Sequence, residues 1–500
     1  MENILKIKNK WKEKKFLVVG LDTDPQKIPP FLLESGKSPL EAMLQFNKKI
    51  IDVSVNDVCG FKINSAFYEK YGIEGLGVMQ KTIEYIKEKD PSVFTIADAK
   101  RGDIENTNEG YKYLLYGDFD FDSLTIHPYL GLEANETFLK DKNKMFFVLA
   151  KTSNKDSGEF QDLDVGGMPL YLKVIKNIKE KWNRNSNCGV VVGATYPEHL
   201  LRAREEAGDD VVFLVPGVGA QGGDLESVLK AGLNSKKEGL LINMSRSVLY
   251  ASNGEDFADK AKEEIQKFNQ QVEKILKEPQ NSWREMKRQF YKKRTLEIFK
   301  QTEAVLTDDH FVYQNQEHGS VYVAKDKINP NPILINEVGN MIADMVKEYE
   351  IDTVVVPAVG GVVLGHAVAR NLSHIKGKNI NSVFIEKGVK DEEGRDTFKI
   401  TRGYDVFLKD KKILVVEDIV NTGYSVKKVI GGVKEAGAQV QAIGIIWNRG
   451  NVKAEELDST APLFSLVEMP FEKYTKETCP LCKADIPINM QFGHGKSFKK

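Results

Sequence analysis

The sequence has few cysteines, no long apolar run and no excess of charge of either sign. Four cysteines in 500 residues are too few for the disulfide framework that holds small secreted domains together. No uninterrupted stretch of 18 apolar residues occurs, and the first residues, MENILKIKNKWKEKKF, are too charged for the apolar part of a signal peptide. We therefore expect a cytoplasmic protein without a membrane partner.

The charge balance narrows the range of partners. Lys and Arg together number 71, and Asp and Glu number 72, which gives a formal net charge of −1. Such a chain has no basic field that would attract nucleic acid or an anionic surface. We expect small-molecule partners and no nucleic acid. The length of 500 residues allows roughly two to four domains.

Short apolar runs recur in the first half, with helix-like segments of mixed charge between them. Runs rich in Val, Ile, Leu and Phe suit strands buried on both faces, and their alternation with helices indicates parallel strands. Eight such units within about 250 residues predict an α/β fold, a (β/α)8 TIM barrel, with an open doubly wound sheet as the alternative. The runs cover residues 16–22, 58–64, 93–100, 123–129, 145–153, 188–195, 211–219 and 239–246.

A group of charges ends the third run, in TIADAKRGDI at residues 95–104. Side chains two residues apart share one face of a strand, so we expect Asp98 and Lys100 to project together, with Asp103 within reach. Neighbouring opposite charges keep each other ionised near neutral pH. A solvated cluster of charges is the alternative interpretation.

Polar residues also end the other runs, in the place where barrels collect their chemistry. Asp22, Lys62 and Ser153 are examples. The glycine-rich loop PGVGAQGGD at residues 216–224 follows the seventh run, and Arg246 follows the eighth. Because glycines let backbone N–H groups approach an anion, we expect a phosphate site there.

These motifs, in this order, resemble the orotidine 5′-phosphate decarboxylase family over residues 10–270. The resemblance rests on LDTD, FKIN, DAKRGDI, HPYLG, KTSN, PGVGAQGGD and SRS. It implies a charged tetrad of Lys62, Asp98, Lys100 and Asp103, with Asp103 reaching across from a second subunit. A homodimer or higher homo-oligomer is therefore expected.

The implied reaction removes CO2 from C6 of a pyrimidine nucleotide and leaves a carbanion that water stabilises poorly. By resemblance, Lys100 supplies a fixed cation and the proton, while Asp98 opposes the substrate carboxylate. No cofactor is expected for this step. Hexulose phosphate synthases share D-x-K-x-x-D, so sugar-phosphate chemistry is an alternative. The implied substrate contacts are Asp22 and Lys62 to the ribose, Thr107 to the substrate, Ser153 to the pyrimidine edge, and Gln221 and Arg246 to the phosphate.

The second half has fewer strands, which lie farther apart and predict a doubly wound sheet. A Lys- and Glu-rich stretch interrupted by Pro279 precedes it, so we predict domains at 1–277 and 278–500. The predicted strands cover residues 353–361, 382–388, 412–423 and 442–450.

The chemistry of the second half concentrates in VVEDIVNTGYS, residues 415–425. A strand delivers Glu417 and Asp418, which suit sugar hydroxyls or a Mg²⁺ bound to them. A helix then opens, and its N-terminal donors suit a phosphate. No Lys follows the glycine, so the segment is not a G-x-x-x-x-G-K-[ST] loop. The candidate phosphate-binding residues are Thr422, Gly423 and Ser425.

This segment resembles the phosphoribosyl pyrophosphate motif of type I phosphoribosyltransferases, and residues 290–490 resemble orotate phosphoribosyltransferases. HFVY, SVY, PAVGG and NRG support the resemblance. It implies that Mg²⁺ is held mainly through phosphoribosyl pyrophosphate near Asp418, that Lys387 and Lys390 lie on a mobile segment, and that Arg449 contacts orotate. Together the two resemblances imply that orotate becomes orotidine 5′-phosphate and then UMP.

The sequence departs from the second family at two positions. Glu386 precedes Lys387 where many members have Arg, and Gln314 falls where many have an early Lys. Phosphate neutralisation is therefore expected from Lys390, Arg395, Lys399 or Arg402. A nucleotide-sensing regulator that keeps this fold without turnover is a different possibility, but no DNA-binding helical motif is present.

The segment CPLC, residues 479–482, forms half of a zinc site. Only His494 is near in sequence, and no second C-x-x-C exists. A similar tail occurs in one branch of orotate phosphoribosyltransferases. The sequence leaves open whether Cys479 and Cys482 bind zinc.

Overall fold

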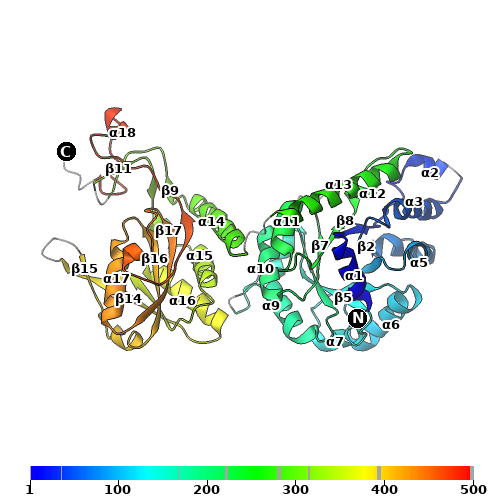
Figure 1. The fold of residues 1–500 in the computed structure, drawn as a ribbon, viewed down its shortest axis with the longest axis horizontal. Helices are drawn as coiled ribbons and strands as arrows, with labels where there is room; N and C mark the ends of the chain where they lie inside the picture. Colours follow the sequence, from blue (N-terminus) through cyan, green and yellow to red (C-terminus); the bar gives the residue numbers. More distant parts are fainter. Residues whose placement is uncertain are drawn as a thin grey trace. The chain divides into compact units, whose positions relative to one another are not determined.

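The computed structural model describes residues 2–34, 36–166, 168–219, 223–278, 283–313, 316–390 and 396–495. The chain divides into two compact units, Met1–Met286 and Lys287–Lys500 (Figure 1). The break expected at Pro279 lies outside the described residues. The domain boundary at 277/278 therefore stays a prediction.

The first unit is a closed barrel of parallel strands in the order β1 to β8, with helices outside it (Figure 1). This confirms the (β/α)8 prediction and excludes the open sheet. Each of the apolar runs contains one strand. The strands are β1 (Leu17–Gly20), β2 (Gly60–Asn64), β3 (Phe94–Arg101), β4 (Ser123–Ile126), β5 (Met145–Lys151), β6 (Cys188–Val192), β7 (Phe213–Pro216) and β8 (Leu240–Met244).

The barrel strands are buried along most of their length, as runs without alternation require. Every residue of β1, β6 and β8 is buried, and β1 closes the barrel by pairing with both β2 and β8. The longer helices are α1 (Glu2–Lys12), α3 (Pro39–Ser54), α5 (Gly72–Lys89), α6 (Glu105–Lys112), α7 (Gly131–Leu139), α9 (Leu170–Asn177), α10 (Pro197–Ala207), α11 (Leu225–Gly232) and α13 (Phe257–Lys277), and the short α12 (Arg246–Leu249) follows β8.

The second unit contains a six-stranded sheet in the order β15-β14-β13-β16-β17-β18. All neighbours are parallel except β14 and β15. The four predicted strands are present, and the sequence did not predict β15 or β18. The strands are β13 (Thr353–Pro357), β14 (Asn381–Lys390), β15 (Asp396–Lys399), β16 (Lys412–Val420), β17 (Gln439–Asn448) and β18 (Leu463–Glu468).

Helices cover both faces of this sheet (Figure 1). Alternate residues of β16 face opposite sides: Leu414 and Val416 pack into one core, while Ile413 and Val415 pack into the other. This alternation explains why the strand reads as a continuous apolar run. The helices of the first core are α14 (Trp283–Gln301), α15 (Pro332–Met345) and α16 (Val362–Lys376), and that of the second is α17 (Tyr424–Glu435).

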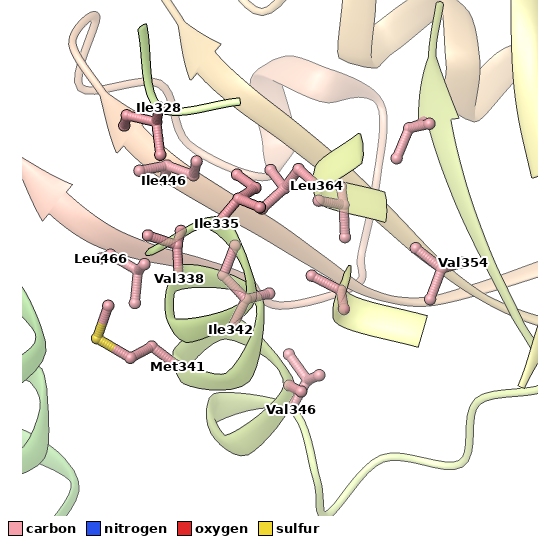
Figure 2. Close-up of a cluster of buried hydrophobic side chains, with 14 of the residues drawn as sticks. Ile328, Ile335, Val338, Met341, Ile342, Val346, Val354, Leu364, Ile446 and Leu466 are labelled. Atoms are coloured by element: carbon pink, nitrogen blue, oxygen red, sulfur yellow. The ribbon is translucent and has the colours of Figure 1, made fainter. Parts of the chain in front are cut away.

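The first core is built around one face of α15 (Figure 2). The Asn331 side chain caps this helix by accepting hydrogen bonds from the N–H groups of Ile333 and Leu334, and Pro332 fixes its first turn. Ile335, Val338 and Ile342 then recur at helical spacing and face the sheet. This core fixes the β13 and β16 ends that carry the second site.

Short strands outside the main sheet form two antiparallel pairs. One pair, β10 with β11, aligns Val312 with His318. No helix in the described ranges is long and apolar enough to cross a membrane. The short elements are β9 (Val305–Leu306), β10 (Phe311–Val312), β11 (His318–Gly319), β12 (Tyr322–Val323), the 3-10 turn η4 (Lys325–Lys327) and α18 (Pro480–Lys483).

Candidate active sites

A cavity of about 310 Å³ opens at the C-terminal ends of the barrel strands. It is lined by residues that lie in or just after β1, β2, β3, β7 and β8, so strands far apart in sequence contribute to one space. Among the predicted site residues, Asp22, Lys62, Asp98 and Arg246 line this cavity.

Opposite charges alternate in a row that includes Asp22, Lys62 and Asp98, which line the cavity, and Lys100, which does not. Lys62 Nζ lies 2.9 Å from Asp98 Oδ2 and 3.3 Å from Asp22 Oδ1. Lys100 Nζ lies 2.6 Å from Asp98 Oδ1. Each carboxylate and ammonium group therefore has an opposite partner, and Asp98 and Lys62 each have two. The structure brings together three of the four residues of the predicted tetrad.

The pKa values of this array reflect competition between burial and charge. Burial raises the pKa of Asp98, but the ammonium groups of Lys62 and Lys100 outweigh it and hold that pKa well below its usual range. Burial lowers the pKa of Lys62, but Asp22 and Asp98 outweigh it, and the net pKa lies above its usual value. Asp98 and Lys62 are therefore ionised at neutral pH.

Lys100 reaches Asp98 from an irregular part of β3. The register between β3 and β4 shifts between Ala97 and Arg101, and Lys100 has φ +47°, a left-handed conformation that is unfavourable for lysine. The two side chains do project together, as expected. They do so through this bulge rather than through regular strand alternation.

Two hydroxyl groups that the sequence did not single out complete the array. Thr125 Oγ1 donates to Asp98 Oδ1 at 2.9 Å and accepts from the Lys100 N–H at 3.0 Å. Ser245 Oγ donates to Asp22 Oδ2 at 2.8 Å. Ser245 lies at the end of a predicted strand, so its position could have indicated it, whereas Thr125 lies within a strand and its residue type alone did not mark it.

The end of the cavity that is predicted to bind phosphate combines a glycine loop with a cation. Gly217 (φ +100°) follows β7, and Arg246 begins α12; both line the cavity. Gly217 and Gly219 (φ +76°) adopt backbone conformations that favour glycine. Gln221 lies outside the described residues, so its predicted phosphate contact stays a prediction.

Three further predicted residues lie apart from this cavity. Asp103 and Thr107 are exposed at the start of α6, where Asp103 Oδ1 accepts from the Ile104 N–H at 2.7 Å. Ser153 is partly buried after β5. None of the three lines the cavity, so their roles as catalytic or binding residues stay predictions.

In the second unit, Glu417 and Asp418 lie buried near the end of β16, with exposed fractions of 6% and 5%. Lys325, on η4, places its Nζ 2.6 Å from Asp418 Oδ2. The sequence did not single out Lys325, which lies more than 90 residues from its partner. Its cation partly neutralises the adjacent carboxylates.

The pKa shifts here differ from those in the barrel. Burial, reinforced by the charge of Asp418, raises the pKa of Glu417 well above its ordinary value. Burial lowers the pKa of Lys325, but Asp418 outweighs it, so the net pKa is raised. Two adjacent buried carboxyls with one lysine can bind hydroxyl groups or a further cation.

Two glycine loops border these carboxyls. A Cβ on Gly360, in PAVGG after β13, would lie 3.0 Å from both Asp418 Oδ2 and Lys325 Nζ. Gly423 has φ +75°, and a Cβ there would lie 2.4 Å from Leu457. It precedes α17, with Thr422 exposed and Ser425 partly buried beside it. The loop after β16 therefore presents a helix N-terminus, as predicted.

Arg449 is buried just after β17, with an exposed fraction of 4%. Its guanidinium lies 3.9 Å from the centre of the Tyr313 ring. Its Nε and Nη2 have no hydrogen-bond partner in the part of the chain that the structure describes. Burial lowers its pKa. A buried guanidinium with unused donors suits a planar anionic ligand.

The Glu386 side chain, at one of the two positions that depart from the family, contacts nearby polar residues. Arg402 Nη2 lies 2.8 Å from Glu386 Oε1, and Thr401 donates to the same carboxylate. Arg402 is thus engaged in an ion pair. The side chains of Lys387, Lys390 and Lys399, together with Gln314 and Arg395, lie outside the described residues.

Comparison with known proteins assigns a family to each unit. Residues 15–261 match the profile described as "Orotidine 5'-phosphate decarboxylase / HUMPS family", and residues 324–472 match "Phosphoribosyl transferase domain". An orotidine 5′-phosphate decarboxylase of Flavobacterium johnsoniae is 46% identical over 264 residues, which cover 53% of this chain and 94% of the relative. One from Cellvibrio japonicus is 41% identical over 273 residues, which cover 54% and 98%.

A solved structure spans both units. The chain is similar to the UMP synthase of Leishmania donovani, with 24% identity, a TM-score of 0.49 and coverage of 92% of each chain. The decarboxylase relatives, by contrast, match the first half alone.

Proposed function

Because the chain belongs to the orotidine 5′-phosphate decarboxylase family through its first half and carries a phosphoribosyl transferase domain in its second, we propose that it makes UMP from orotate in two steps. The second unit joins orotate to phosphoribosyl pyrophosphate and releases pyrophosphate. The barrel then removes CO2 from orotidine 5′-phosphate. The observation that carries the proposal is the alternating Lys62–Asp98–Lys100 array inside a barrel of this family.

In the decarboxylation step, Lys100 is the proton donor to C6. Its ammonium, 2.6 Å from Asp98, stabilises the negative charge that develops as CO2 leaves, and it then delivers its proton to the carbanion. Asp98, whose pKa is held low, opposes the substrate carboxylate more than the neutral CO2. We propose that this step needs no cofactor.

Remote groups of the substrate hold it in place. Asp22 and Lys62, 3.3 Å apart, bind ribose hydroxyls, and Arg246 binds the phosphate together with Gln221. Ser153 contacts the pyrimidine edge. Binding energy from the phosphate can be used to orient the reacting carboxylate against Asp98.

In the transfer step, Glu417 and Asp418 bind the ribose hydroxyls of phosphoribosyl pyrophosphate. Thr422, Gly423 and Ser425 bind its 5′-phosphate at the N-terminus of α17. Lys387 and Lys390 neutralise the leaving pyrophosphate. The loop at Gly360, beside Lys325, is suited to that group as well.

Mg²⁺ fits this arrangement. Burial, reinforced by the charge of Asp418, raises the pKa of Glu417, and a divalent cation nearby would favour the ionised form of Glu417. Bound mainly through the substrate near Asp418, Mg²⁺ would neutralise charge on the departing pyrophosphate. Lys325 holds Asp418 in position for it.

Arg449 recognises the orotate carboxylate. Its unused Nε and Nη2 donors form a fork that matches a carboxylate. The Tyr313 ring at 3.9 Å holds the guanidinium plane in place.

The barrel also requires a second copy of the chain. Asp103 is exposed, and exposed apolar side chains lie near it, with Ile104 at 62% and Tyr129 at 92%. The His127 N–H donates to the Arg101 carbonyl at 2.7 Å, which brings their loops together. We propose a homodimer in which this face carries Asp103 into the partner's cavity.

Complementation tests the dimer. A mixture of refolded Lys100→Ala and Asp103→Ala chains forms mixed dimers with one intact cavity if Asp103 acts across the interface, so decarboxylation should recover to at most about a quarter of the parent rate. If Asp103 acts within its own subunit, every cavity in the mixture is defective. No recovery above either variant alone would then contradict the arrangement.

The overall proposal is tested by supplying orotate, phosphoribosyl pyrophosphate and Mg²⁺ and following orotate and UMP by chromatography. We expect orotate to disappear and UMP to form at a matching rate. Lys100→Ala should instead accumulate orotidine 5′-phosphate, and Asp418→Asn should leave orotate unconsumed. A parent chain that accumulates orotidine 5′-phosphate contradicts the role of the barrel.

A further inference from the structure

A cluster of two histidines and two cysteines lies in the second unit, apart from the carboxyls of β16. His310 precedes β10 and His318 lies in β11, while Cys479 and Cys482 lie at and within α18. One ligand atom from each of the four residues lies within 4.8 Å of the others. His310, His318 and Cys479 are buried, with exposed fractions of 1%, 0% and 0%.

Backbone hydrogen bonds bring these distant residues together. The His318 N–H donates to the Tyr474 carbonyl at 2.8 Å, and the Tyr474 N–H donates back at 3.0 Å. The Asn489 N–H donates to the His310 carbonyl at 2.7 Å. The segment 474–489 therefore runs along the β10–β11 pair, and the C-x-x-C turn of α18 lies over both histidine rings.

The distances among the side chains suit a single tetrahedral ion. Cys482 Sγ lies 3.2 Å from His318 Nδ1 and 3.6 Å from His310 Nε2. Cys479 Sγ lies 3.7 Å from His310 Nε2. Zinc bond lengths at tetrahedral angles place sulfur and nitrogen ligands about 3.5 Å apart. The two ring nitrogens, at 2.8 Å, would move apart by about 0.5 Å.

The histidine ring next to the sulfurs is already oriented. His310 Nδ1 lies 2.7 Å from the Ile486 carbonyl, which can only accept a hydrogen bond. Nδ1 therefore carries the proton, and the lone pair of Nε2 points at Cys479 and Cys482. A carbonyl behind a histidine ligand is the usual support in metal sites.

We propose that His310, His318, Cys479 and Cys482 bind one Zn²⁺ as a structural site. Two sulfurs and two imidazole nitrogens form a donor set that suits zinc and not Mg²⁺ or Ca²⁺. All four coordination positions come from the protein, which is typical of structural rather than catalytic zinc. The half-site seen in CPLC is completed by His310 and His318 and not by His494.

The site connects the C-terminal segment to the proposed orotate pocket. The turn between β10 and β11 contains Tyr313, whose ring lies 3.9 Å from the Arg449 guanidinium. Zinc holding His310 and His318 would fix this turn, and with it the position of Arg449. This consequence rests on the proposed function, whereas the zinc site does not.

Metal analysis of the purified full-length chain tests the site. Grown with added zinc and isolated without chelators or a histidine tag, the parent should contain about one zinc per chain. Cys479→Ser and Cys482→Ser should retain less than about a tenth of that content. Cys188→Ala and His494→Gln remove the same residue types outside the cluster and should keep the full amount.

A second measurement uses the parent chain, so it does not depend on whether the variants fold. Parent chain stripped of metal and reduced should bind one Co²⁺ and show the visible absorption of tetrahedral cobalt–thiolate coordination, which Zn²⁺ should abolish. A reduced, folded parent that takes up neither metal overturns the proposal. So does a Cys479–Cys482 disulfide in protein isolated without air.

Because each activity is proposed for a different unit, the zinc site and the proposed function can be tested separately. Zinc removal followed by readdition of Mg²⁺ should lower orotate consumption at least tenfold, while decarboxylation of supplied orotidine 5′-phosphate stays within twofold. A chain that holds one zinc but never consumes orotate contradicts the proposed function alone. Zinc removal that lowers both activities equally overturns the link to Tyr313.

Discussion

Asp98 in the barrel and Glu417 in the second unit are two largely buried carboxyls near the C-terminal ends of parallel strands, and their pKa values move in opposite directions. Asp98 lies between Lys62 and Lys100, which hold its pKa low. Glu417 lies beside Asp418, and burial with this like charge raises its pKa. Burial acts in the same direction on both, so the sign of the neighbouring charge decides the outcome.

The difference fits the two reactions. In the proposed decarboxylation, the barrel holds a negative charge against the substrate carboxylate, and Lys62 and Lys100 keep that charge in place before the substrate arrives. The second unit is proposed to bind a substrate that carries a cation. There, Glu417 lies buried beside Asp418, which pairs with Lys325, and a substrate cation would favour the ionised form of Glu417.

Removal of Lys100, one of the two lysines that pair with Asp98, should have the largest effect on activity. Lys100→Ala should lower decarboxylation by about 10³-fold or more, because both the fixed charge and the proton donor are lost. Orotidine 5′-phosphate decarboxylation is measured by absorbance, and orotate consumption by the second unit is the internal control. A decarboxylation rate within tenfold of the parent would show that the lysine does not have this role.

Removing the like charge beside Glu417 should have the next largest effect. Asp418→Asn should lower the transferase rate by about 10²-fold, because the substrate cation loses an oxygen partner and Lys325 loses its ion pair. Decarboxylation should be unaffected. Equal loss of both activities would indicate that the two units fold together, and the comparison between their sites would fail.

Arg449 tests whether an unused cation in the second unit serves the substrate. Arg449→Met should raise the KM for orotate by about tenfold or more, as expected for loss of a charge-assisted hydrogen bond. Arg449→Lys keeps the charge without the fork and should recover only part of the affinity. A KM change confined to phosphoribosyl pyrophosphate would place the arginine elsewhere in the reaction.

The smallest effect is a difference in pH dependence. The lowered pKa of Asp98 gives stability that is present above about pH 3.9 and lost as the pH falls below that value. The raised pKa of Glu417 costs stability as the pH rises above about 4.3. As the pH is lowered, the free energy of unfolding of the parent should fall relative to that of Asp98→Asn. As the pH is raised, the free energy of unfolding of the parent should fall relative to that of Glu417→Gln.

Calorimetry of each variant against the parent between pH 3 and 8 would measure these trends, with expected shifts in unfolding midpoint of about 2–4 °C. The two differences should change in opposite directions with pH. If both differences in unfolding midpoint between parent and variant become smaller on acidification, the two carboxyls do not have pKa values shifted in opposite directions.

Much of this architecture follows from the sequence because strand burial and strand ends leave local patterns. The eight apolar runs of the barrel each contain a strand, and the polar residues that end them converge because parallel strands share one edge. Asp22, Lys62, Asp98 and Arg246 meet in one cavity for this reason.

What the sequence could not predict depends on contacts between distant segments. Lys325 reaches Asp418, and His310 reaches Cys479, only through tertiary packing, which leaves no spacing to recognise. The ion pair between Arg402 and Glu386 likewise removes a cation that the sequence left available. Residue type indicates which side chains could belong to a site, and the tertiary fold determines which of them are in contact.

The backbone at Lys100 sets a limit on improving this protein. With φ +47°, the residue occupies a conformation that costs a lysine about 1 kcal/mol or more and that glycine adopts freely. Selection for heat resistance alone would therefore favour glycine at this position and remove the proposed proton donor. Laboratory evolution of a more heat-stable variant should therefore also select for growth without uracil. Stabilising substitutions are then kept only if the enzyme still makes UMP.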